Sequence, residues 1–128
     1  FPEAEVINVL DEGFLIDFDD RLTPQLRRRM SELIGYCQDN KADAIGLACS
    51  VYAPVVDSAR DLVDVPSVSS YGPVMADAVA AGPRVGLIAS VPATMRNSEY
   101  YLKLAAEEAG KSVEPHLCLA EDLIPDAG

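Results

Sequence analysis

The sequence predicts an α/β protein of the doubly wound class, with mostly parallel strands, flanking helices and parts of two similar Rossmann-like lobes. Two observations carry this prediction. Segments with strand character alternate with longer helix-like segments along the 128 residues, which is typical of right-handed crossovers between parallel strands. The segments at 43–49 and 84–90 are apolar without alternation, as expected for parallel strands covered on both faces.

The first elements are a strand and a long helix. A strand is expected at 5–10, and an acidic connection, expected to be a solvated loop, follows it at 11–22. The helix is expected to start after Thr23, a favoured N-cap residue, with Pro24 at its first position. Apolar residues then recur at helical spacing and predict one face packed on the core. They are Leu26, Met30, Leu33, Ile34 and Cys37.

The rest of the chain continues the alternation, and glycine and proline mark its boundaries. Pro73 and Gly82 bracket one helix, with proline inside the start and glycine past the end. Pro115 would confine the last strand to an edge or a bulge, because proline cannot donate to the ladder. The expected elements are a strand at 43–49, a helix at 52–63, a strand at 65–70, a helix at 73–82, a strand at 84–90, a helix ending at Gly110 and a strand at 112–119.

Gly82-Pro83 is the expected junction between two lobes. Residues 1–82 would form a first α/β lobe that lacks its opening strand, and residues 83–128 would begin a second, incomplete lobe. The chain has no initiator Met, and its last residues have the character of a connection. We therefore expect it to be a segment of a longer protein.

The charge of the chain argues against nucleic-acid binding. It carries 10 Lys and Arg against 21 Asp and Glu, a net charge of −11, whereas a phosphate backbone needs a basic face. Arg27, Arg28 and Arg29 form a basic cluster that is most simply a solvated helix face. No apolar run is long enough to span a membrane, and the N-terminal residues do not have the pattern of a signal peptide.

The cysteines and the acidic residues do not predict a metal site. Three cysteines at scattered spacing argue against a disulfide framework and favour a reducing compartment, so a cytoplasmic protein is expected. With one histidine and no paired cysteines, the usual zinc spacings are missing. The acidic connection also lacks the ligand spacing of a calcium loop, and "GPRVG" is no dinucleotide fingerprint. We expect no metal and no cofactor.

Residues that follow the strands are the candidates for chemistry, because ligands of open α/β sheets bind outside the carboxyl ends of the strands. Hydroxyl groups, backbone amides and one thiol are expected to converge there. The residues are Cys49 and Ser50, then Ser69, Ser70 and Tyr71, and then Ser90 and Thr94.

Cys49 lies where a predicted strand ends and a helix, with Pro54 in its first turn, begins. A helix N-terminus presents unpaired N–H groups and a partial positive charge, which favour a thiolate. The same amides would hold a carboxylate or a developing enolate. The position therefore suits a base or a nucleophile. It suits about equally a buried cysteine that packs as a small hydrophobe.

The other cysteines and the histidine are expected to be structural. Cys37 completes the apolar stripe of its helix, and Cys118 lies late in a strand, so packing is the expected role of both. His116 alternates with Leu117 in the predicted edge strand, and no catalytic role is expected for it.

An ordered set of motifs resembles the aspartate/glutamate/hydantoin racemase superfamily. It lies in "KADAIGLACSVYAPVVDSARDLVDVPSVSSYGPVMADAVAAGPRVGLIASVPAT". In that superfamily an apolar strand ends in Cys followed by Ser, Thr or Asn. A "VP" strand, a helix and an "RVG" strand ending in hydroxyl residues and a threonine come later. The matching residues are Cys49-Ser50, Val65-Pro66, Arg84-Val85-Gly86, Ser90 and Thr94.

The resemblance implies two α/β lobes with the active site between them, a homodimer, and cofactor-independent removal of a proton alpha to a carboxylate. By motif, Cys49 would be the base, and Ser50, Ser90 and Thr94 would hold the substrate carboxylate. The substrate would be an amino acid, a hydantoin or a related acid. The superfamily's second catalytic cysteine precedes a threonine, and Cys118 does not fit that place.

Two alternatives therefore stay open. One is a one-cysteine decarboxylase or maleate-type isomerase of the same superfamily. The other is a non-catalytic protein that binds small acids.

Overall fold

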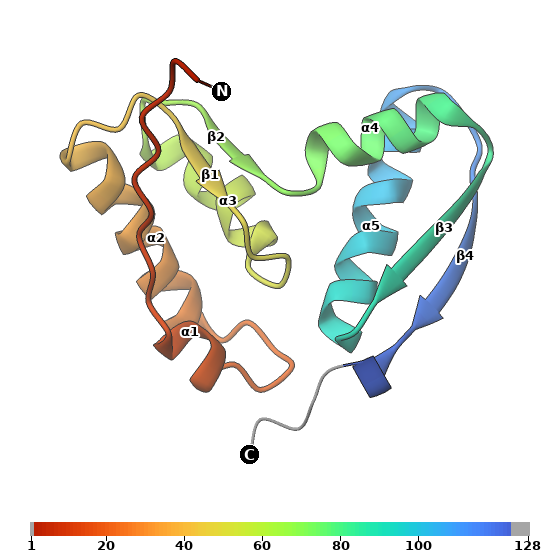
Figure 1. Ribbon diagram of the computed structural model, residues 1–128, viewed down its shortest axis with the longest axis horizontal. Coiled ribbons are helices and arrows are strands. Elements are labelled where there is room, and N and C mark those ends of the chain that lie inside the picture. The colour runs from red at the N-terminus through yellow and green to blue at the C-terminus, as the bar shows by residue number, and fades with distance from the viewer. Residues whose placement is uncertain (1, 124–128) are drawn as a thin grey trace.

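Two small parallel sheets, each with its own helices, form the computed structural model, which describes residues 2–123 (Figure 1). The first sheet pairs β1 (Ile45–Leu47) with β2 (Ser67–Ser69), and the second pairs β3 (Arg84–Ala89) with β4 (Glu114–Leu119). A helix connects the two strands of each sheet, so the predicted α/β class is confirmed. The helices are α1 (Gly13–Ile16), α2 (Pro24–Asp39), α3 (Ala53–Ala59), α4 (Gly72–Ala81) and α5 (Pro92–Glu108), with 3-10 turns η1 (Arg60–Leu62) and η2 (Glu121–Leu123).

Helix α2 begins and packs as predicted. The side-chain oxygen of Thr23 accepts a hydrogen bond from the backbone N–H of Leu26 at 3.2 Å, and a proline occupies the first turn. Leu26, Met30 and Ile34 are buried against α3 and the residues around Tyr52. The apolar stripe thus forms one side of the first hydrophobic core.

The remaining helices lie close to their predicted positions. Helix α3 ends at Ala59 and continues as η1, so the helix predicted at 52–63 has a tighter last part. Helix α5 begins at Pro92, because a proline at the first position already has helical φ, and it ends close to the predicted Gly110. Gly110 follows the end of α5 at φ +62°, in the left-handed region that favours glycine.

The prediction of a strand at 5–10 is wrong for the described structure. This segment has no strand partner within residues 2–123, and its apolar side chains are open to solvent. Val6, Ile7 and Leu10 are 74%, 78% and 80% exposed. Strand propensity largely reflects packing against neighbouring strands, so an apolar sequence without such a neighbour does not form a strand.

The second sheet is covered on one face, not on both as its apolar sequence predicted. Val85, Leu87 and Ala89 are buried beneath α4 and α5, whereas Gly86 and Ile88 between them are exposed. Side chains alternate between the two faces of a strand, so every second residue of β3 faces solvent.

The acidic connection is more ordered than the solvated loop that was expected. It contains α1, whose Phe14 packs edge-on against Tyr52 with ring centroids 4.9 Å apart. The Arg29 guanidinium lies 2.5 Å from Asp11 and 2.8 Å from Asp17, and it stacks over the Phe14 ring. Arg29 is therefore part of this contact, whereas its two arginine neighbours on α2 are exposed as expected.

Two hydrophobic clusters interlock across the molecule. The first surrounds α2, α3 and Tyr52, and the second lies between α4, α5 and β3. Ala53 of α3 packs into the second cluster, and Ala93 of α5 packs into the first. Helix α4, which was expected in the first lobe, shares its core with α5; the division at Gly82-Pro83 stays a prediction. Over the described range, no helix has the length and apolar character needed to cross a membrane.

Candidate functional site

The carboxyl ends of β1 and β3 point toward the same region between the two halves of the molecule (Figure 1). Ser50 lies in the loop after β1, and Thr94 lies in the first turn of α5, which follows β3. The Ser50 and Thr94 side-chain oxygens are 2.8 Å apart and hydrogen-bonded, although the residues are 44 positions apart in the chain. The predicted convergence of hydroxyl groups is thus confirmed for this pair.

Asn97 ties the same two segments together and was not expected from the sequence. Its side-chain amide nitrogen donates to the Ser50 carbonyl at 3.0 Å and lies 3.5 Å from the Val51 carbonyl. The sequence signal was its position three residues after Thr94, which places both side chains on one face of α5. Asn97 therefore holds the loop after β1 against the start of α5.

We call the contact between the loop after β1 and the start of α5 the junction. Tyr71, which follows β2, connects a third strand end to it. Its hydroxyl donates to the Thr94 carbonyl at 3.3 Å and accepts a hydrogen bond from the buried Ser98 hydroxyl at 3.4 Å. Its ring stacks on Tyr101 with centroids 4.7 Å apart. The start of α5 is consequently fixed by the ends of both β1 and β2.

Cys49 lies in the loop after β1, half-buried against the first hydrophobic cluster. Helix α3 starts at Ala53, so the thiol precedes the first helical turn by several residues and is not directly at its N-terminus. The Ala53 N–H donates to the Ser50 carbonyl at 3.4 Å, which uses one of the amides expected to face a ligand. The Cys49 side chain is thus partly exposed to solvent, and its catalytic role stays a prediction.

The nearest aromatic group to this loop is Tyr52, which is completely buried. Burial raises the pKa of the Tyr52 hydroxyl, and the neighbouring Cys49 adds to the effect when it is charged. The hydroxyl donates to the Phe14 carbonyl at 2.7 Å. Tyr52 is therefore a neutral structural group that anchors the Cys49 loop on α1.

Ser90 directly follows β3 and is half-buried. Its hydroxyl has no hydrogen-bonding partner within the part of the chain that the structure describes. Ser90 thus lies at the predicted sheet edge, but no side-chain hydrogen bond joins it to Ser50 or Thr94 in the described structure.

The other cysteines and the histidine lie away from this junction. Cys37 is half-buried on α2, and its packing role stays a prediction, because it does not belong to the residues packed against the first hydrophobic cluster. Cys118 is exposed on β4, so the packing role expected for it is wrong: although α5 contacts β4, the residues from His116 to Leu119 are all exposed. His116 is also exposed on β4, with its ring nitrogen 3.6 Å from Glu114. No group of three metal-binding side chains occurs in the described residues.

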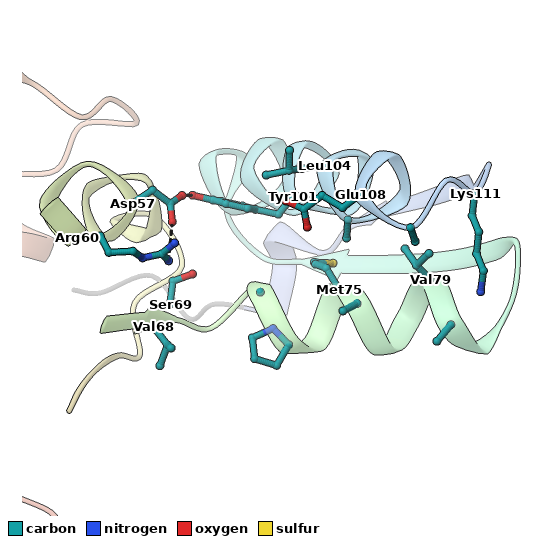
Figure 2. Close-up of a pocket in the computed structure, with 16 residues that line it drawn as sticks. Asp57, Arg60, Val68, Ser69, Met75, Val79, Tyr101, Leu104, Glu108 and Lys111 are labelled. Carbon is teal, nitrogen blue, oxygen red and sulfur yellow. Dashed lines mark hydrogen bonds and ion pairs between the residues drawn. The ribbon is translucent and has the colours of Figure 1, made fainter. Parts of the chain in front are cut away.

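A cavity of about 450 Å³ lies between α4 and α5 (Figure 2), and Cys49 does not line it. Asp57 and Arg60 lie at one end and Lys111 at the other, and between them the walls are mostly apolar (Figure 2). The Tyr101 hydroxyl donates to the Asp57 carboxylate, which links α5 to α3. Burial and this carboxylate raise the pKa of Tyr101.

A second cavity, of about 240 Å³, lies beside the junction and is bordered by Val51, Ala93 and Asn97. Neither cavity is lined by Cys49 or by the three predicted substrate-binding residues. The space for a substrate beside the thiol therefore remains a prediction.

Comparison with known proteins supports the fold. No protein-family model matches the sequence, and no curated protein does. Among solved structures, the fold matches glutamate racemase from Aquifex pyrophilus with a TM-score of 0.60 and 23% sequence identity. The match covers 82% of this chain and 42% of the racemase chain, so the chain spans less than half of that protein. The resemblance to the racemase superfamily is confirmed at the level of the fold: this chain is similar in architecture to part of a glutamate racemase.

Proposed function

We propose that this chain is part of a cofactor-independent racemase-type enzyme that removes a proton from a carbon next to a carboxylate, with Cys49 as the base. The observation that carries the proposal is the hydrogen bond between Ser50 and Thr94, which joins the ends of β1 and β3 at the residue after Cys49. The similarity in fold to glutamate racemase is its second support. The substrate would be an amino acid, a hydantoin or a related acid.

The hydroxyl groups would bind the substrate carboxylate. In the pair of Ser50 and Thr94 one hydroxyl donates to the other, which leaves one O–H group to donate to a ligand. Ser90 would supply another O–H group from the end of β3. A hydrogen bond to a charged group contributes about 1.5–3 kcal/mol, so two such donors would orient a small acid firmly.

Cys49 would then act as a general base. Its thiolate takes the α-proton, so the C–H bond breaks, an S–H bond forms, and the electron pair moves into the adjacent carboxyl or carbonyl group. Hydroxyl and amide donors stabilise the resulting enolate. A positioned base contributes about 10²–10⁴-fold to such a rate. Racemisation additionally requires a proton donor on the opposite face, which the resemblance assigns to a second cysteine.

Two alternatives stay open. Cys118 is paired in register with the exposed Ile88, on the face of the second sheet that the helices leave open, so it does not supply the second thiol. A one-cysteine decarboxylase or maleate-type isomerase of the same superfamily needs no second thiol and is therefore the first alternative. The second alternative is a non-catalytic protein that binds small acids, which would use the hydroxyl groups without the Cys49 thiol.

The proposal also includes the lobes around the site, the oligomeric state and the cellular compartment. The lobes at 1–82 and 83–128 would enclose it, and the protein would act as a homodimer in the cytoplasm. The bare edge strand β4 is consistent with further protein covering this side.

Hydrogen exchange tests the proposal. The protein is incubated in deuterated water with a panel of amino acids, hydantoins and malonates, and α-deuterium is measured by mass spectrometry. We expect incorporation with the wild type and with Cys37→Ala, the control for loss of a half-buried thiol, but at least about 100-fold less with Cys49→Ala. Equal incorporation by Cys49→Ala would remove this thiol from the mechanism. Binding without any incorporation would support the binding protein.

A further inference from the structure

The lining of the 240 Å³ cavity beside the junction is positively charged, although the protein as a whole is acidic. It lies among the acidic connection, the first turns of α2 and α3, and the start of α5. Arg21, Arg27 and Arg96 line it, although the whole chain has 10 basic residues and a net charge of −11. Asp20 is the only carboxylate in its lining. Three guanidinium groups and one carboxylate leave an excess of two positive charges around a small space.

The arginines of this cavity are incompletely neutralised. Arg96 lies 2.9 Å from the Asp20 carboxylate and also donates to the Asp20 carbonyl at 3.0 Å. Arg21 and Arg27 have no carboxylate within ion-pair distance among residues 2–123. Arginine, with five N–H donors in a planar group, is suited to carboxylate and phosphate oxygens. Arg21 and Arg27 are exposed residues of the cavity lining without an ion-pair partner in the described range, whereas the one carboxylate of the lining, Asp20, already pairs with Arg96.

We propose that this cavity binds a small dianion, either inorganic phosphate or a short dicarboxylate. Two negative charges on one small ion match the excess of positive charge in the lining of the cavity. The site is separate from the proposed substrate site, because neither Ser50 nor Thr94 lines it.

Titration calorimetry with phosphate and with malonate, at constant ionic strength, tests this proposal on the full chain. We expect millimolar or tighter binding of at least one ion, and the stronger of the two identifies the preferred geometry, tetrahedral or planar. Arg27→Gln is expected to weaken binding about tenfold. The matched control is Arg28→Gln, an exposed neighbour on the same helix that does not line the cavity, and it should leave the affinity unchanged.

Asp20→Asn should change the affinity for the dianion in the opposite direction. Removing the carboxylate frees Arg96 and should tighten binding several-fold, because it adds one net positive charge to the cavity. Asp20 has φ +48°, which asparagine also adopts readily, so the loop should keep its conformation. The proposal is overturned if the wild type binds neither ion at tens of millimolar, or if Arg27→Gln and Arg28→Gln weaken binding equally. Failure of this test would leave the proposed base at Cys49 unaffected, since the exchange assay measures that function independently.

Discussion

The region where α3 meets α5 and the edge strand β4 differ in their side-chain contacts. At the junction, hydrogen bonds cross between distant segments, from Ser50 to Thr94, from Asn97 to Ser50 and from Tyr101 to Asp57. On β4, apolar side chains such as Leu117 and Leu119 are about half exposed, at 51% and 43%. The comparison teaches that specific contacts are concentrated where the strand ends meet, which is where a ligand of an α/β sheet is expected to bind.

The largest contrast between the two regions should appear in stability. Leu102 of α5 is completely buried in the second cluster, so Leu102→Ala should lower the free energy of unfolding by about 2–5 kcal/mol. Leu117→Ala is the matched change on β4 and should cost less than about 1 kcal/mol, because half of that side chain is already in water. Urea denaturation of both variants measures the difference. Similar losses would mean that β4 is covered in solution.

A smaller effect is expected from the polar contact at the junction. Asn97→Ala removes the hydrogen bond to the Ser50 carbonyl and should lower the free energy of unfolding by about 1 kcal/mol. It should also raise the KM of any exchanging substrate more than it lowers kcat, because the Ser50 hydroxyl is displaced. Asn40→Ala is the control, since Asn40 makes a similar but exposed bond to the Tyr36 carbonyl. If both variants behave alike, Asn97 has no special role in positioning the loop.

The smallest effect concerns the ion pair that orders the acidic connection. Hydrogen bonds from Arg29 lower the pKa of Asp11. A lowered folded-state pKa adds stability that is present above the ordinary pKa of about 4 and is lost as the pH falls through the folded value. Asp11→Asn should therefore be slightly less stable than the wild type at neutral pH, and the difference should shrink as the pH falls below about 4. Asp19→Asn, an exposed residue without an ion pair among those described, should show no such convergence in thermal melts. A constant offset for Asp11→Asn at all pH values would contradict this role.

Local signals in the sequence were sufficient for the longer helices but not for α1, and long-range contacts were not visible in the sequence. Thr23 and the proline after it predicted the start of α2 because a cap and its helix are adjacent in the chain. The apolar segment at 5–10 was misread as a strand because a strand depends on a distant partner that the sequence pattern does not reveal. In the site, the rule of strand ends identified Ser50 and Thr94, because it follows from topology alone.

Asn97 shows why the rest of the site was missed. Its role depends on a carbonyl 47 positions earlier in the chain, and its spacing from Thr94 shows only that the two residues share a face of α5, not which carbonyl that face meets. Arg29 was likewise assigned to a solvated face, because its partner Asp11 reaches it only when the acidic connection folds back on α2. Such contacts require the tertiary structure.

Protection of the Cys49 thiol from alkylation tests the central claim most directly. The protein is treated with iodoacetamide, with and without each acid of the substrate panel, and labelling of Cys37, Cys49 and Cys118 is followed by peptide mass spectrometry. We predict that at least one carboxylate slows labelling of Cys49 while the exposed Cys118 reacts at an unchanged rate. If no acid changes the Cys49 rate, or if every acid slows both thiols equally, Cys49 does not face a carboxylate site.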